Sequence, residues 1–443
     1  MKIKALSVAC SLALAASAVS TTVAAEEGFE FHGYFRSGAL FTGSTGGNQA
    51  LYPASKESLG RLGIESDDFY ELAFNKTWAL DNGQNIAIKT RLGQHNTGED
   101  AFEAQQNYSI NGSATGLLEG FVEFEGLTNT GKMWGGQRYY GRDNYIFMTD
   151  FFYTDWSGTG LGVQQMELGG GKWDFAYLAS NRPDDNGYGS DESAPLHLGH
   201  ARADYGSWRV ELVGKYMADN VSRSDDGNGN ITVSEFATNG IEAHVQYTPK
   251  DFFWLGNGFS KISVQAGSGL GASSMLGKSF TNYNGYVPGS AGKGPVGMAY
   301  VDKGDKSYRA LAYGGWFGSS VMIFPSVQAQ YDDMDNGNKS LWWSAMARPV
   351  FLINSIDNFT IATEFGYTET DVEGSGGNTL FESSQYKATI APTWVIGTGT
   401  GPAPEIRLLA SYIDGKTNGQ DNTNANGEQK GEFVYGVQAD MWW

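Results

Sequence analysis

The sequence lacks two features that often mark secreted and membrane proteins. Its one cysteine, Cys10, lies in an N-terminal leader, so the chain without that leader has no disulfide and no thiol chemistry. Beyond the leader, no stretch approaches the roughly 18 consecutive apolar residues of a membrane helix. Proline is scarce too, with 11 residues in 443. A disulfide-stapled fold and a helical membrane protein are therefore both excluded.

The leader has the composition of a secretory signal. Lys2 and Lys4 precede an alanine-rich apolar stretch over residues 5–19, and small residues at 23–25 suit a signal peptidase. We expect a signal peptide over residues 1–25 and one domain over residues 26–443. Lipidation at Cys10 is disfavoured, because a lipoprotein signal needs an apolar residue three positions earlier, where Ser7 stands.

Positive charge is also in short supply. The chain has 30 Lys and Arg against 49 Asp and Glu, a formal net charge of −19. Nucleic-acid binding needs a basic footprint, so we expect no nucleic-acid partner. The excess acid is readily explained by solvated loops. A bias toward cations in a pore is a second interpretation.

The chain is rich in aromatic residues (14%) and in glycine (61 residues), and its apolar residues alternate with polar ones. Alternation sorts side chains onto the two faces of a strand. In residues 29–38 one face carries Phe29, Phe31 and Phe35. The other carries Glu30, His32, Tyr34 and Arg36. In residues 432–443, Trp443 shares a face with Phe433 and Tyr435, whereas Trp442 shares the other with Gln438 and Asp440.

The same alternation recurs over residues 69–74, 259–266 and 405–412, with polar, turn-rich segments between such stretches. An apolar face suits lipid, and a polar face suits a water-filled lumen. Lipid offers no partner to an unpaired backbone group, so the barrel must close. The sequence therefore predicts an all-β, antiparallel transmembrane β-barrel in the outer membrane of a Gram-negative bacterium.

Four aromatic residues fall on the lumenal face, beside charged ones. They are Tyr34, Phe69, Phe259 and Trp442, with Arg36, Glu71, Lys261 and Asp440 as neighbours. An aromatic ring exposed to water is unfavourable unless it packs or meets a ligand. Sugars have an apolar C–H face that can stack on a ring and hydroxyls that bond to charged groups. A sugar path is one interpretation; rings filling gaps between wall and loops are the other.

Several short motifs in this order resemble those of the maltoporin family. They occur at residues 31–38 (FHGYFRSG), 61–63 (RLG), 71–72 (EL), 134–142 (WGGQRYYGR), 150–153 (DFFY), 258–261 (GFSK), 342–343 (WW), 348–349 (RP) and 442–443 (WW). The resemblance implies an 18-stranded barrel that forms homotrimers. It also implies a third loop that folds inward as a constriction and a lumenal aromatic slide flanked by ionic tracks.

Carried over by position, the resemblance assigns the slide to Tyr34, Phe69, Phe152, Phe259 and Trp442. It assigns the polar tracks to Arg36, Arg61, Glu71, Arg142 and Asp150. The chain departs from the family at several places. Phe69 and Phe152 replace tyrosines, Phe147 replaces a histidine, one extra residue lies between Arg142 and Asp150, and Ile353 falls near a slide tryptophan. An aromatic residue from a neighbouring subunit would be Tyr108 or Phe102.

The expected function is selective diffusion of maltose and maltodextrins. The alternatives are a porin for sucrose or other sugars, and a general diffusion porin or surface receptor. We expect no enzymatic activity, because none of the five histidines adjoins a nucleophile motif. We also expect no metal and no cofactor. Residues 224–235 resemble half of a calcium loop, but the first ligand position holds Ser224 and a polar hairpin is favoured.

Overall fold

The computed structural model describes residues 28–50, 53–96, 116–180, 195–225, 231–279, 301–396 and 404–443. The predicted signal peptide lies outside these residues and stays a prediction, as do Phe102 and Tyr108. Within the described part, no helix has the length and apolar character needed to cross a membrane.

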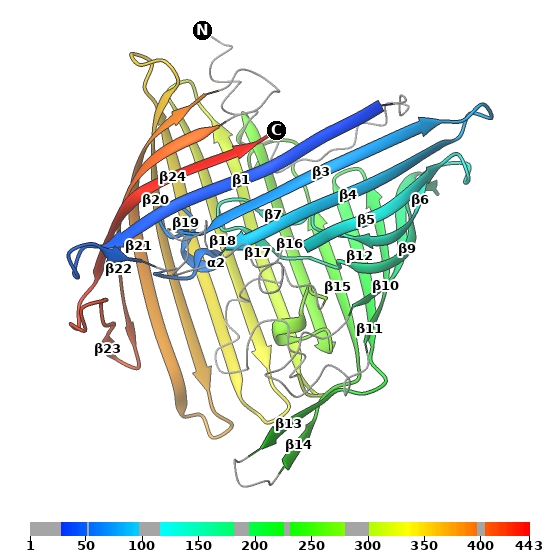
Figure 1. The fold of residues 1–443 in the computed structure, drawn as a ribbon. Helices are drawn as coiled ribbons and strands as arrows, with labels where there is room; N and C mark the ends of the chain where they lie inside the picture. The colour runs from blue at the N-terminus through cyan, green and yellow to red at the C-terminus, as the bar shows by residue number, and fades with distance from the viewer. Residues whose placement is uncertain are drawn as a thin grey trace.

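The chain forms a closed barrel of 18 antiparallel strands, as predicted (Figure 1). Their bounds are β1 Gly28–Thr42, β3 Asp68–Ala79, β4 Asn85–Asn96, β5 Gly116–Glu125, β6 Lys132–Arg138, β9 Gly158–Leu168, β10 Gly171–Ser180, β11 Leu196–Tyr205, β12 Trp208–Tyr216, β15 Asn239–Tyr247, β16 Gly258–Gly269, β17 Lys306–Phe317, β18 Val321–Asp333, β19 Lys339–Leu352, β20 Phe359–Glu373, β21 Thr379–Val395, β22 Glu405–Thr417 and β24 Glu432–Trp442. Strand β1 pairs with both β3 and β24, which closes the barrel.

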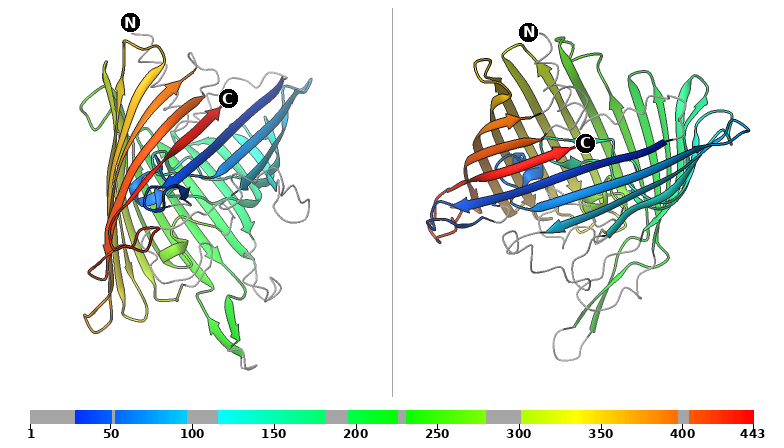
Figure 2. Two further views of the ribbon diagram at one scale, coloured as in Figure 1. Left: turned by 60° about the vertical axis from the view of Figure 1, so that its left-hand side comes forward. Right: turned by 45° about the horizontal axis from the view of Figure 1, so that its top comes forward.

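Strands that follow one another in the sequence are neighbours in the barrel, so the connections between them alternate between its two ends. Short turns, such as 80–84 and 206–207, lie at the end where β1 begins and β24 ends. The opposite end carries longer loops and the hairpin of β13 (Val221–Asp225) and β14 (Ile231–Glu235), which projects from the barrel (Figure 2). Two-residue strands β2 (Asn48–Gln49) and β23 (Gln420–Asp421) extend the sheet there.

The expected alternation of faces is confirmed along the first and last strands. Phe29, Phe31 and Phe35 of β1 are exposed on the outside, whereas Arg36 faces inward and is buried. At the closing seam, the backbone of Trp443 exchanges two hydrogen bonds with Gly33, and its ring lies 5.6 Å from that of Phe31. Trp443 therefore belongs to the outward aromatic surface.

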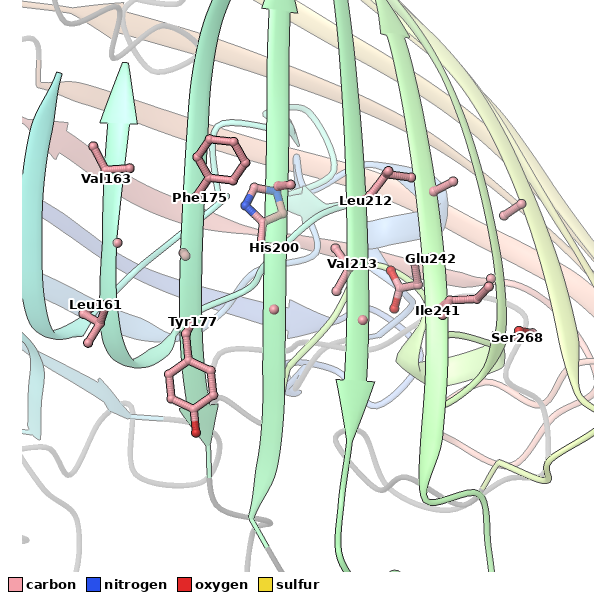
Figure 3. A pocket seen from close by; sticks show the side chains of 18 of the residues that line it. Leu161, Val163, Phe175, Tyr177, His200, Leu212, Val213, Ile241, Glu242 and Ser268 are labelled. Atoms are coloured by element: carbon pink, nitrogen blue, oxygen red, sulfur yellow. The ribbon is translucent and has the colours of Figure 1, made fainter. Parts of the chain in front are cut away.

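The outer face of β9–β17 is hollowed. A recess of about 1080 Å³ lies there (Figure 3). Exposed Leu161, Tyr177, Leu212 and Ile241 line it, and glycine and alanine residues such as Gly214 form its floor. In a membrane barrel, such an apolar recess on the outer wall meets lipid chains rather than the transported solute.

Inside the barrel, three loops pack against the wall of the later strands. The first loop (residues 43–67) contains α2 (Lys56–Leu59), which contacts β19, β20 and β21. The third loop (139–157) contains the short strands β7 (Tyr145–Ile146) and β8 (Phe151–Phe152), and was predicted to fold inward. The sixth loop contributes residues 270–279, including the 3-10 helix η3 (Ser273–Met275).

The first and third loops share a hydrophobic core with inward side chains of the wall, whereas Leu270 and Met275 of the sixth loop belong to a separate cluster. The core includes Leu59 and Ile64 of the first loop, Phe147 and Phe151 of the third, and Phe324 of β18. The inward folding of the first and sixth loops was not predicted. Their apolar residues carry no strand-like alternation, and their partners lie far away in the sequence.

Candidate functional site

Three of the predicted slide residues and two of the predicted track residues meet on the lumenal face of β1, β3 and β24. Tyr34 lies opposite Trp442 on one side and opposite Glu71 on the other, and Arg36 lies opposite Phe69. The Tyr34 and Phe69 rings are 5.8 Å apart between centroids. The neighbours come from both ends of the chain because the barrel closes at this seam.

Charged groups surround the Tyr34 hydroxyl. It accepts hydrogen bonds from the guanidinium Nη1 of Arg36 (3.1 Å) and Nη2 of Arg61 (2.8 Å). Arg36 also pairs with Asp67 at 2.5 Å and with Glu65 at 3.2 Å. The first loop thus supplies a cation and two carboxylates to this lumenal strip.

A salt bridge joins the first loop to the third. The Lys56 ammonium lies 2.6 Å from Asp150 and 3.0 Å from Glu65, while Arg61 lies 2.8 Å from Glu65 and 3.8 Å from Asp440. We call the resulting group the charged cluster. Its members are Arg36, Lys56, Arg61, Glu65, Asp67, Asp150 and Asp440.

Asp150 sits at a tight turn of the third loop. Its φ of 53° is in the left-handed region, which non-glycine residues seldom adopt, so surrounding contacts must hold it there. Burial alone would raise the pKa of Asp150. The positive charges of Lys56 and Arg61 outweigh it and lower that pKa to about 2. Asp150 is therefore ionised at neutral pH.

A stack of rings and guanidinium groups connects the third loop to the wall. The Arg142 guanidinium lies 3.9 Å from the Tyr139 ring centroid and 4.0 Å from that of Phe152, and Tyr145 stacks on Phe152 at 4.5 Å. Arg91 of β4 lies over Tyr139 at 5.8 Å. Cation–π contacts of this kind hold planar groups in register.

Glu71 anchors that stack rather than joining the charged cluster. It lies 2.7 Å from Arg91, which also pairs with Glu119 at 2.7 Å, and it accepts a hydrogen bond from the Tyr139 hydroxyl at 3.4 Å. The predicted track residues Arg142 and Glu71 thus belong to one arrangement, and Arg36, Arg61 and Asp150 to another.

Phe259 lies apart from the other predicted slide residues. It is 6.1 Å from Phe317, which is 6.0 Å from Phe324, and Phe147 packs edge-on against Phe324 at 5.3 Å. Phe317 was missed by sequence reasoning because β17 was not among the segments assigned to a face. Ile353 belongs to a turn, where its backbone NH bonds to the Phe359 carbonyl.

Buried polar groups hold the far side of the third loop. Glu211 of β12 accepts hydrogen bonds from the Asn144 side chain (2.8 Å) and the Trp156 indole (3.3 Å). Its oxygens also lie 3.0 Å from His200 and 3.1 Å from His244. A buried carboxylate with four partners fixes the loop position firmly.

Comparisons with known proteins agree with this architecture. The family model described as LamB porin matches residues 29–443. The chain belongs to the LamB porin family. It is accordingly an outer-membrane porin, a channel protein, as expected from the resemblance to maltoporins.

Relatives of similar length support the family assignment. The chain is 27% identical over 448 residues to a maltoporin of Vibrio cholerae serotype O1, covering 97% of this chain and 98% of that one. It is also 27% identical over 440 residues to a maltoporin of Hahella chejuensis, covering 97% and 96%. Among solved structures, the outer membrane protein OprD of Pseudomonas aeruginosa matches with a TM-score of 0.45 and 10% identity, covering 94% of each chain.

Proposed function

We propose that this porin passes sugars selectively, with maltose and maltodextrins as the preferred class, along an aromatic slide flanked by charged groups. The observation that carries the proposal is the juxtaposition of Tyr34, Phe69 and Trp442 beside Arg36 and Asp440. Aromatic rings and ion pairs on one lumenal strip suit a solute with an apolar face and a hydroxylated rim.

Weak, repeated contacts suit conduction. One stacking contact is worth about 1 kcal/mol by analogy with other aromatic pairs, which favours entry without trapping the solute. The hydroxyls of the sugar would bond to the charged cluster on one side and to the Arg142 stack on the other. Phe259 and Phe317 would continue the path as a second group of rings.

Current block in planar bilayers tests the proposal. We expect maltohexaose to interrupt the ion current through the purified porin at concentrations where a size-matched polyether does not. Liposome swelling should give the same order of preference. Equal behaviour of maltodextrins and size-matched solutes would favour a general diffusion porin, and Tyr34→Ala would then change nothing.

A porin for sucrose or other sugars is the second candidate. It is favoured by two positions of the third loop, where Phe152 lacks the hydroxyl of a tyrosine and Phe147 lacks the imidazole of a histidine. Phe147 is buried against Phe324. Stronger block by sucrose than by maltohexaose would support it. Competition between the two sugars in Phe152→Tyr then shows whether that hydroxyl sets the preference.

We further propose that the chain works as a homotrimer in outer-membrane lipid, with an aromatic residue of the second loop entering a neighbouring pore. Phe102 and Tyr108 are the candidates. Cross-linking of the purified porin measures the assembly, and a chain that stays monomeric in mild detergent would argue against it.

A further inference from the structure

The third loop presents two aromatic residues as a cross-strand pair. Tyr145 of β7 lies directly opposite Phe152 of β8, and the two rings stack with centroids 4.5 Å apart and planes 25° apart. Directly opposed residues in a two-stranded sheet project from the same side. One ring therefore covers the other.

Both faces of the Phe152 ring are occupied. Tyr145 lies at 4.5 Å and the Arg142 guanidinium at 4.0 Å from its centroid, and two groups so close cannot share one face of a single six-membered ring. Tyr139 holds Arg142 from its other side, at 3.9 Å. A sugar could reach only the edge of Phe152, and stacking requires a face.

Tyr145 is the last ring of this stack. It is half-buried, its ring packs against the hydrophobic core of the loops as well as on Phe152, and among the described residues its hydroxyl has no hydrogen-bond partner. The charges that act on its hydroxyl come from Asp150, Arg61 and Glu65, and Arg61 also donates to Tyr34. Tyr145 thus lies between the third-loop stack and the slide. Burial raises the pKa of Tyr145, so its hydroxyl stays protonated and can donate.

We propose that Tyr145, rather than Phe152, is the third-loop residue that contacts sugar at the constriction. The exposed part of its ring packs on the pyranose ring, and its hydroxyl bonds to a sugar hydroxyl. Phe152 is a positioning residue, which holds Tyr145 toward the pore and is itself held by Arg142. This inference rests on the proposed sugar-transport function.

Two substitutions separate the contributions of the ring and the hydroxyl. Tyr145→Leu keeps an apolar cover on Phe152 but removes the aromatic face and the hydroxyl, whereas Tyr145→Phe removes the hydroxyl alone. The measurement is the half-blocking concentration of maltohexaose and of sucrose on single channels. Tyr308→Leu is the matched control, because Tyr308 is exposed on the outer face of β17.

We expect Tyr145→Leu to raise the half-blocking concentration about fivefold or more, since stacking and a hydrogen bond are both lost. Tyr145→Phe should raise it about twofold. Tyr308→Leu should leave it unchanged, and all three should keep the ion conductance of the parent porin.

The opposite pattern would overturn the inference: unchanged block in both Tyr145 variants with strong loss in Phe152→Leu would make Phe152 the contact residue. A parent porin that neither sugar blocks would overturn the proposed function, and this inference with it. If sugar blocks the parent porin and blocks the Tyr145 variants equally well, this inference alone is overturned.

Discussion

At the residue scale, the two adjacent tryptophans at the closing seam lie on opposite faces of the barrel wall. Trp442 lies opposite Tyr34 on the lumenal side, while Trp443 packs near Phe31 on the outside. One position along a strand changes the face, so the two neighbours have different surroundings and substitutions in them should have different effects.

Trp442→Ala should weaken sugar block without closing the pore. Loss of one stacking contact, about 1 kcal/mol, corresponds to roughly a fivefold rise in the half-blocking concentration of maltohexaose. Ion conductance should stay at the parent value. Trp394→Ala is the control, because Trp394 is exposed on the outer wall. Equal block of Trp442→Ala and the parent would remove Trp442 from the slide.

Glu57 makes the first loop sensitive to pH. Burial raises its pKa to about 7, against the opposing effect of Lys56. A raised carboxyl pKa means that the folded loop prefers the protonated form. The contribution of Glu57 to the stability of the folded loop is then full below about pH 4.5, which is the pKa of the group in the unfolded chain. That contribution falls by roughly 3 kcal/mol as the pH rises to 7.

We therefore expect the open-channel current to be noisier at pH 8 than at pH 5.5, because the first loop is less firmly seated. Glu57→Gln cannot ionise and should show the same low noise at both values. Asp150, with a pKa of about 2, remains ionised across this range. If Glu57→Gln keeps the pH difference of the parent, another group is responsible.

At the scale of elements, strands were predictable and inward loops largely were not. The side chains of a strand alternate between its two faces. The faces of β1, β3, β16, β22 and β24 could therefore be assigned from the sequence. The contacts that seat the loops are non-local. Lys56 and Asp150 are 94 positions apart, and Lys387 and Gly60 are 327 apart.

The same distinction explains the candidate site. The lumenal strip of Tyr34, Phe69 and Trp442 followed from alternation and family resemblance. The partners that fix Arg36 and Asp150, namely Glu65, Asp67 and Lys56, come from a loop without periodicity. Arg142 was predicted as part of a polar track, but the sequence could not show that Tyr139 and Phe152 cover its guanidinium.

Lys387 of β21 secures the first loop from the opposite wall. Its ammonium donates to the carbonyls of Gly60 and Leu62, both at 2.7 Å, and to Glu364 at 2.6 Å. Lys387→Met should cost about 3–5 kcal/mol of local stability, because buried acceptors lose their donor. We expect a larger and more variable ion conductance.

The control for this experiment is Lys416→Met, since Lys416 is exposed and pairs with Asp421 outside the loop core. Its conductance should match that of the parent. A steady parent-like conductance in Lys387→Met would show that the remaining contacts of the first loop suffice to hold it.

At the scale of the whole molecule, the barrel depends on one seam between its first and last strands. Nine paired positions join β1 to β24, and the Gly33–Trp443 backbone bonds extend that pairing toward the turn end. A barrel has no stable open form in lipid, because an open seam exposes unpaired backbone groups.

Trp443→Ala should lower the amount of folded porin in the outer membrane several-fold, since the ring over the Gly33–Phe31 surface is lost at the point of closure. The measurement is the fraction that migrates as folded barrel in unheated gel samples. Trp442→Ala should accumulate normally. If the two variants accumulate equally, the ring of Trp443 is not required for closure of the barrel.

The pairing within the charged cluster has a consequence for energetics across the membrane. Arg36, Lys56 and Arg61 each lie beside a carboxylate, so the cluster holds strong local dipoles with little net charge despite the −19 of the chain. A neutral solute that crosses it displaces no net charge. The Donnan potential of the outer membrane acts on ions and not on such a solute, so the flux of the solute should follow its concentration gradient alone.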